Sequence, residues 1–203
     1  VSIINSLPTK NTRKIIFICG LGGAGKTEFS NSLHKQLGES SVIFRHDWYL
    51  KYPTLVRKER MRQAVASKDS QRINAEENPV NWMDDDAFVK DLKEFRDTGA
   101  LSLTNVWNQQ TGDRDLSLEI TSEPHGIIIV EGIYLLHEPV ARLADLTIRL
   151  EISPEIARQR ANQRDKYRSD VEYLAYKQQL VQKYDLPYFA KYTHNIDITI
   201  DNN

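Results

Sequence analysis

The feature that most constrains this chain is the glycine-rich segment 20–27, which reads GLGGAGKT. It satisfies the pattern Gly, four residues, Gly, Lys, Ser or Thr. Glycines in such a loop let backbone N–H groups turn inward around phosphate oxygens without a side-chain clash. The helix that follows directs its positive end at the same anion. We therefore expect this segment to bind the phosphates of a nucleotide.

The residues on either side of the loop supply the structural context that this motif requires. Residues 14–19 (KIIFIC) form a short β-branched and aromatic run, which predicts a buried strand. Residues 26–37 carry apolar side chains at helical spacing, and Gly38 stands where a helix C-cap belongs. Residues 41–46 predict a second strand. A strand, a helix and a strand in this order indicate a βαβ unit and a parallel sheet.

Further apolar stretches at 127–130, 146–152 and 196–200 predict three more strands of that sheet. Residues 101–107 and 115–120 predict two further strands, and the turn-rich residues between them indicate that the two strands form a hairpin. We expect helices over 55–68, 84–98, 154–164 and 171–183. The sequence therefore predicts a three-layer α/β/α P-loop NTPase fold with a five-stranded parallel sheet, a small hairpin insertion and a helical lid.

Composition narrows the class of protein. The chain has 203 residues, and its 27 basic and 28 acidic side chains give a net charge of −1, which is not the charge of a nucleic-acid coat. Its apolar runs are too short for a membrane span, and residues 1–12 lack the apolar region of a signal peptide. The single cysteine, Cys19, is expected to be a buried strand residue. We expect a cytoplasmic protein with neither nucleic-acid nor membrane partners.

The phosphate loop predicts how ATP and Mg²⁺ would be held. We expect the Lys26 side chain to reach the β- and γ-phosphates and the Thr27 hydroxyl to bind Mg²⁺. Glu131 follows the strand at 127–130 and is placed like the acid that helps to hold Mg²⁺ in P-loop enzymes. The remaining phosphate contacts are expected from the backbone of Gly20, Gly22, Gly23, Ala24 and Gly25.

Asp47 follows the strand at 41–46, at the same carboxyl edge of the predicted sheet. An alcohol acceptor must lose a proton during phosphoryl transfer, and a positioned carboxylate helps as general base. A nucleoside monophosphate would instead be repelled by that carboxylate. Asp47 therefore favours a hydroxyl acceptor and is expected to be catalytic, although a solvated loop acid is the alternative.

A basic stripe follows the strand at 146–152. Arg160, Arg164 and Arg168 are spaced i, i+4, i+8 and share one face of a continuous helix. Their guanidinium groups are suited to bind phosphates and to stabilise the transferred phosphoryl group, with Arg160 and Arg164 in catalytic roles. The alternative is a solvated basic face. The five histidines lack metal-ligand spacing, so we expect no histidine metal site.

These residues resemble the uridine kinase-like P-loop kinases, whose relatives include phosphoribulokinase, pantothenate kinase and nicotinamide riboside kinase. The resemblance covers about residues 14–200. It rests on the phosphate loop and on the segments Asp47-Trp48-Tyr49, Asn81-Trp82, Asp86-Ala87-Phe88, IIIVEG and Arg160…Arg164-Asp165. It implies a single domain over 1–203, with an acceptor-side insertion at about 50–122 and a lid at about 154–170.

In this family the aspartate that matches Asp47 is the base on the acceptor hydroxyl, and the lid arginines contact phosphates. Together with position in the chain, the resemblance implies an acceptor site formed by Asp47, Tyr49, Trp82, Asp84 and Trp107. The two tryptophans are alternatively core residues. The chain has Met83 where uridine kinases carry an aspartate for the ribose hydroxyls, and its hairpin VWNQQTGDR lacks their base-reading histidine.

The sequence therefore predicts an ATP-dependent kinase of a small-molecule hydroxyl, with a nucleoside as the expected acceptor. A kinase of a non-nucleoside alcohol and a degenerate ATP-binding protein stay open. A GTPase-like switch is disfavoured because the guanine-reading Asn-Lys-x-Asp string is absent. The purine base and a homo-oligomeric state also stay open.

Overall fold

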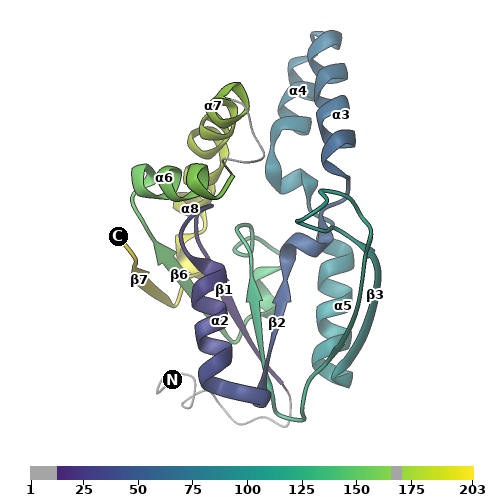
Figure 1. The fold of residues 1–203 in the computed structure, drawn as a ribbon, viewed down its shortest axis with the longest axis vertical. Coiled ribbons are helices and arrows are strands. Elements are labelled where there is room, and N and C mark those ends of the chain that lie inside the picture. Colours follow the sequence, from purple (N-terminus) through teal and green to yellow (C-terminus); the bar gives the residue numbers. More distant parts are fainter. Residues whose placement is uncertain (1–12, 166–170) are drawn as a thin grey trace.

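A five-stranded parallel sheet forms the centre of the molecule (Figure 1). The computed structural model describes residues 13–165 and 171–203. The strand order is β2-β5-β1-β6-β7. The strands are β1 (Lys14–Cys19), β2 (Ser41–Arg45), β5 (Ile127–Glu131), β6 (Leu146–Glu151) and β7 (Ile198–Asp201). The five predicted core strands and the three-layer α/β arrangement are confirmed.

Strand β1 lies in the middle of this sheet, between β5 and β6. Ile16 pairs with Ile129 on one side and with Leu146 on the other. A strand covered on both faces reads as a continuous apolar run, which explains the sequences KIIFIC and IIIVE. Cys19 is fully buried here, and burial raises the pKa of its thiol to about 12 against the opposing charges of Lys26 and Arg149.

Helix α2 (Lys26–Leu37) packs against β1, β2 and β5, and it ends at Gly38 with φ +63°, as predicted. Helix α5 (Asp85–Thr98) buries Phe88, Leu92 and Phe95. The sequence predicted that α5 would begin at Asp84. That boundary was wrong by one residue, because Asp84 is the N-cap and its carboxylate accepts from the Ala87 N–H at 3.3 Å.

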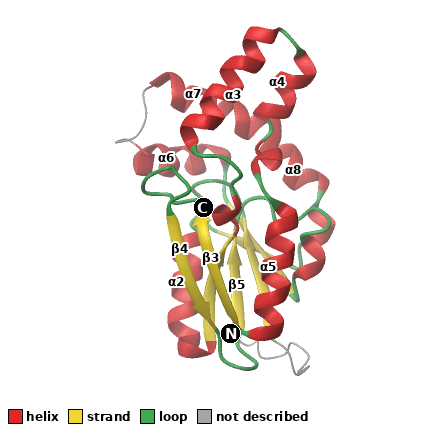
Figure 2. Ribbon diagram, turned by 90° about the vertical axis from the view of Figure 1, so that its right-hand side faces the viewer, coloured by secondary structure: helices red, strands yellow, loops and turns green. Residues whose placement is uncertain are grey.

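The predicted hairpin is present as the antiparallel pair β3 (Ala100–Val106) and β4 (Leu116–Thr121), which runs alongside α5 (Figure 2). Helix α3 (Thr54–Ser67) is also present. Helix α4 (Ser70–Glu77), capped by the Asp69 carboxylate, was not predicted. The described side chains of α4 include no buried residue, so its sequence carries no apolar period that would reveal a helix.

The C-terminal helices differ most from the prediction. Helix α6 (Pro154–Asp165) is as expected, but the predicted helix over 171–183 is α-helical only in α7 (Val171–Leu180). The chain continues as a π-helix (Val181–Asp185) and then as the unpredicted α8 (Leu186–Lys191). Pro187 lies in the first turn of α8, where a proline is tolerated.

Short 3₁₀-helices complete the described chain at Gly38–Ser40, His46–Tyr49, Pro79–Trp82, Ala141–Leu143 and Thr193–Asn195. The one at His46–Tyr49 follows β2 directly, so β2 ends at Arg45 and not at His46 as predicted. The pairs α3–α4 and α6–α7 rise at the carboxyl end of the central strands (Figure 1). None of the helices within 13–165 and 171–203 is long and apolar enough to cross a membrane.

Phe44 of β2 gives a test of this core. Its ring is fully buried and lies 5.3–6.0 Å, centroid to centroid, from the rings of Trp48, Tyr49, Phe88 and Phe95. We expect Phe44→Ala to lower the free energy of unfolding by roughly 3–5 kcal/mol, measured by urea denaturation. Phe44→Leu should lose clearly less, and an equal loss would contradict the importance of the ring contacts.

Candidate active site

The phosphate loop packs tightly against the start of α6 at Gly23. This residue has φ +91°, and a Cβ built there would lie 2.3 Å from the backbone oxygen of Ala157. Only glycine fits both the left-handed backbone and this approach. At the neighbouring Gly22 a Cβ would meet no atom of the described chain within 4 Å. The loop is therefore built around specific glycines rather than being generally flexible.

The Lys26 side chain curls across the loop. Its ammonium group donates to the backbone oxygens of Gly20 at 3.0 Å and of Leu21 at 2.9 Å. The loop also receives a contact from the C-terminal end of the chain, where the Asn202 amide donates to the Ala24 oxygen at 2.9 Å. Sequence reasoning missed Asn202, which lies beyond the last strand and carries no motif.

Glu131 is a buried carboxylate at the end of β5. Its Oε1 pairs with the Arg45 guanidinium at 3.1 Å, whereas its Oε2 is buried without a hydrogen-bond partner among the described residues. Burial raises the pKa of Glu131, and Arg45, the Thr27 hydroxyl and Lys26 act in the opposite direction. A hydroxyl beside an unpartnered carboxylate oxygen is the hard-oxygen donor set that Mg²⁺ prefers, so these residues fit that ion.

Asp47 lies in the short helix His46–Tyr49, and its side chain is exposed. After the dominant effect of burial, the charge of Asp47 contributes to raising the pKa values of Glu131 and Tyr134. Asp47 therefore shares the carboxyl edge of the sheet with both of them. This is the arrangement expected from its position after β2.

Tyr134 and Asp185 form a buried pair that sequence reasoning missed. The Tyr134 hydroxyl donates a short hydrogen bond to Asp185, which is the last residue of the π-helix. Burial raises the pKa of Asp185 to about 6, although the Tyr134 hydrogen bond and the charge of Lys26 oppose that rise. The buried Asp185 thus lies close enough to Lys26 for the charge of the lysine to affect its pKa. No motif around Asp185 in the sequence indicates this proximity.

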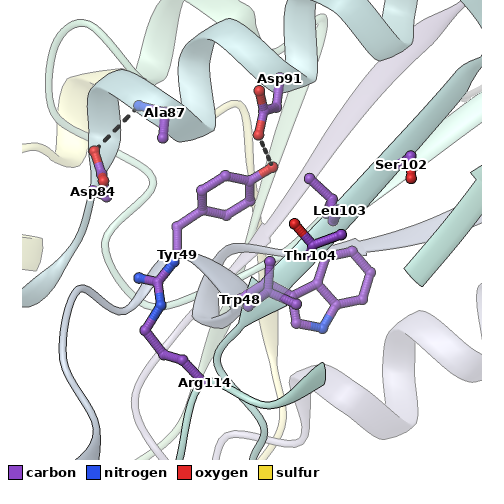
Figure 3. A pocket seen from close by; sticks show the side chains of 10 residues that line it. Trp48, Tyr49, Asp84, Ala87, Asp91, Ser102, Leu103, Thr104 and Arg114 are labelled. Atoms are coloured by element: carbon purple, nitrogen blue, oxygen red, sulfur yellow. Dashed lines mark hydrogen bonds between the residues drawn. The ribbon is translucent and has the colours of Figure 1, made fainter. Parts of the chain in front are cut away.

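A cavity of about 240 Å³ lies between α5, the hairpin and the segment after β2 (Figure 3). Tyr49 and Asp84, both predicted to bind the acceptor, line it together with Asp91 and Arg114. The Tyr49 hydroxyl donates to Asp91 at 3.0 Å, and burial is the first cause of its raised pKa. The cavity is therefore polar, with carboxylates and a guanidinium on its wall.

The two predicted tryptophans lie elsewhere. Trp82 donates from its indole nitrogen to the Glu76 backbone oxygen at 2.7 Å. The Arg57 guanidinium lies 5.0 Å from the ring centroid of Trp82 and 5.9 Å from that of Trp107. The structure therefore brings Trp82 and Trp107 together around an arginine of α3, not onto the wall of the cavity beside Tyr49. Their place in the acceptor site stays a prediction.

The predicted lid arginines are only partly described. Arg160 is exposed on α6, and its guanidinium donates to the Asn202 backbone oxygen at 3.2 Å. For Arg164 the structure describes only the backbone, within α6, and Arg168 lies outside the described residues. Arg160 and the phosphate loop thus both contact Asn202.

Gly22 and Gly23 provide a matched pair of variants. We expect Gly23→Ala to lower the thermal unfolding midpoint by several degrees, because a Cβ forces apart the loop and the Ala157 backbone. Gly22→Ala should leave the midpoint nearly unchanged. Equal midpoints, measured by scanning calorimetry, would contradict this account of the loop.

Asp185 gives a pH-dependent test of stability. Its folded pKa of about 6 exceeds the ordinary value of 3.8, so protonation favours the folded state and this contribution disappears as pH rises through 6. We expect the Asp185→Asn variant to gain, relative to the parent protein, up to about 3 kcal/mol of unfolding free energy between pH 4 and pH 8. Urea unfolding at both pH values measures this. The exposed Asp97→Asn should show no such trend, and a pH-independent difference for Asp185→Asn would contradict burial as the cause.

Comparison with known proteins gives the family. The family model described as phosphoribulokinase/uridine kinase matches residues 15–196. A uridine kinase from Ligilactobacillus salivarius is 28% identical over 158 residues, which cover 77% of this chain and 68% of that protein.

Among solved structures, a Silicibacter protein proposed to be a fructose transport system kinase has a TM-score of 0.67 at 18% identity, covering 98% of this chain and 95% of its own. Phosphoribulokinase from Rhodobacter spheroides has a TM-score of 0.65 at 14% identity, covering 95% and 71%. These likenesses confirm the fold. Because the family model spans most of the sequence, the chain belongs to the phosphoribulokinase/uridine kinase family and is a kinase that acts on a hydroxyl group of a small molecule.

Proposed function

We propose that this protein transfers the γ-phosphoryl group of ATP, bound with Mg²⁺, to a hydroxyl group of a nucleoside. The observation that carries the proposal is the position of Asp47. This exposed carboxylate lies at the edge that holds Glu131 and Tyr134, and the next two residues, Trp48 and Tyr49, line the polar cavity. An acceptor in that region would present its hydroxyl to Asp47.

The reaction follows from these side chains. The oxygen of the acceptor hydroxyl bonds to the γ-phosphorus while Asp47 accepts the proton of that hydroxyl. The bond between the γ-phosphorus and the β–γ bridging oxygen breaks at the same time, which releases ADP. Lys26, Arg160 and Arg164 stabilise the charge on the transferred group, and the phosphate-loop amides and Arg168 bind the phosphates. Thr27 and Glu131 would hold Mg²⁺, which would neutralise phosphate charge when bound.

We assign the whole chain to one domain with two helical parts that flank this edge. The acceptor-side insertion spans about 50–122, and the lid spans about 154–170. Contacts between α4 and the π-helix support this assignment, since Lys183 donates to Asn74 at 3.1 Å and Tyr184 donates to Glu77 at 2.8 Å. The insertion is therefore tied to the segment that follows the lid.

Two observations bear on the nucleoside. Met83, which replaces the ribose-binding aspartate of uridine kinases, is 4% exposed and is not among the residues that line the cavity. The adjacent Asp84 lines the cavity instead, with one oxygen accepting from Ala87, and we assign the ribose hydroxyls to it. The uridine kinases among the relatives support the same acceptor class.

A kinase of a smaller, non-nucleoside alcohol is the second candidate, and the hairpin favours it. Asn108 and Thr111 both donate to the Asp115 carboxylate, at 2.9 and 3.1 Å. The Arg114 guanidinium donates to the backbone oxygens of Asn105 and Leu50, at 2.8 and 2.9 Å. Polar groups of the hairpin that are satisfied by these contacts leave fewer to recognise a base.

Acceptor-stimulated ADP release with MgATP tests the function across uridine, cytidine, nicotinamide riboside, pantothenate, ribulose 5-phosphate and simple sugars. We expect stimulation by a nucleoside, and we expect Asp47→Asn to lower kcat by about 10²–10⁴-fold while ATP affinity changes little. Asp97→Asn, an exposed acid at the far end of α5, serves as the matched control.

The outcomes separate the candidates. Stimulation by a sugar alone would replace the nucleoside with the second candidate. Normal turnover of the Asp47→Asn variant would remove Asp47 from the reaction. Bound ATP with no stimulation by any acceptor would indicate a degenerate ATP-binding protein.

A further inference from the structure

We infer that His46, Asp85, His137 and Tyr188 form a largely buried positioning network that orients the His46–Tyr49 helix and therefore holds Asp47 at the active edge. The inference rests on the proposed role of Asp47 as the base. It adds residues that belong to neither the phosphate loop, the acceptor cavity nor the lid. None of the four was expected from the sequence to act at the site.

Asp85 is the centre of the network. Its Oδ1 lies 3.1 Å from His46 Nε2, and its Oδ2 lies 2.8 Å from His137 Nε2. His46 is 1% exposed and His137 is 9% exposed. Both oxygens of one carboxylate are thus occupied by two buried imidazoles, which come from the segments after the neighbouring strands β2 and β5.

Tyr188 determines the proton position on His137. Its hydroxyl oxygen accepts from the backbone N–H groups of Leu136 at 2.7 Å and of His137 at 3.1 Å. The hydroxyl proton then points to His137 Nδ1, 2.8 Å away, so that this nitrogen is an acceptor. The ring proton of a neutral His137 consequently lies on Nε2 and is donated to Asp85.

Asp85 is held in its ionised form. Burial acts to raise its pKa, but the hydrogen bonds from His137 and His46 outweigh burial and leave the pKa well below its ordinary value. An ionised carboxylate accepts hydrogen bonds only, so His46 Nε2 must also donate. The chain of donors therefore specifies one orientation for each of the two rings.

The His46 ring is confined from other directions as well. Phe88 of α5 lies edge-on at 4.5 Å between ring centroids. A Cβ at Gly132 would lie 2.8 Å from the Cβ of His46, so the backbone after β5 also presses on this side chain. Because Asp47 is the next residue, a shift of the His46 ring would move the backbone that carries the base.

The network joins the parts that a transfer reaction must bring together. His46 precedes the base, and Asp85 follows Asp84, which lines the acceptor cavity. His137 lies in the loop after β5, and Tyr188 lies in α8, beyond the lid segment. A purely apolar core would pack these segments without the cost of partly burying the Asp85 carboxylate, so the polar chain is best explained by the single geometry that it imposes.

Paired substitutions at His46 separate positioning from packing. In His46→Gln the amide nitrogen reaches the place of Nε2 and keeps the donor to Asp85, whereas His46→Leu removes it. For the acceptor that the parent enzyme uses, we expect His46→Leu to lower kcat by about 10–100-fold with the KM for ATP within threefold, because small displacements of a reacting group cost this much. His46→Gln should keep kcat within threefold.

A stability control accompanies these variants. Leu146→Ala shortens a buried side chain at the start of β6, far from the active edge, and should lower the unfolding midpoint while leaving kcat unchanged. Asp85→Asn should follow His46→Leu, since an asparagine amide has one acceptor oxygen and cannot accept from both imidazoles. Equal kcat values for His46→Leu and His46→Gln in an active enzyme would overturn the inference while leaving the proposed function intact.

Hydrogen exchange tests the network without any acceptor. The Leu50 amide donates to the Asp47 backbone oxygen at 3.2 Å, so its protection reports the order of the short helix. We expect protection of residues 46–50 to fall in His46→Leu and to persist in His46→Gln. Equal protection in both variants would overturn the inference, even if the parent protein phosphorylated none of the acceptors and the proposed function had failed.

Discussion

The parallel pairing of β1 with β5 and β6 is the constraint on which the rest of the structure depends. One register, with Ile16 opposite both Ile129 and Leu146, aligns the carboxyl ends of the central strands. The loops that leave those ends therefore emerge at one edge. The phosphate loop, the Asp47 helix, Glu131 and the start of α6 meet there because the apolar strands beneath them are buried, and not because they attract one another.

The strands, the phosphate loop and the acids at the strand ends could be predicted because each depends on local sequence. A buried parallel strand is a short apolar run, and a phosphate loop is a string of glycines followed by Lys26 and Thr27. Helix α4 could not be predicted, since its described side chains are not buried. The π-helix at Val181–Asp185 also escaped, because a change of helical period has no composition of its own.

The polar groups that the prediction missed share a different property. His46, Asp85 and His137 are separated by tens of residues, and each alone looks like an ordinary loop or cap residue. Their proposed role depends on hydrogen bonds between segments that are far apart in sequence, and the same is true of the contact between Tyr134 and Asp185. The two tryptophans show the converse. Trp82 and Trp107 are close in sequence to residues that line the cavity, but both rings pack beside the Arg57 guanidinium instead. Their positions along the chain did not predict this contact.

The contact between Gly23 and Ala157 has a consequence for motion. The first turn of α6 lies against the phosphate loop, so a Cβ at Gly23 has no room beside Ala157. A lid that closes over bound ATP would have to bend beyond Ala157, toward the arginine-bearing end of α6. If the proposed lid closes in this way, the contact between Gly23 and Ala157 would fix where the moving part of α6 begins, at the loop proposed to bind the phosphates.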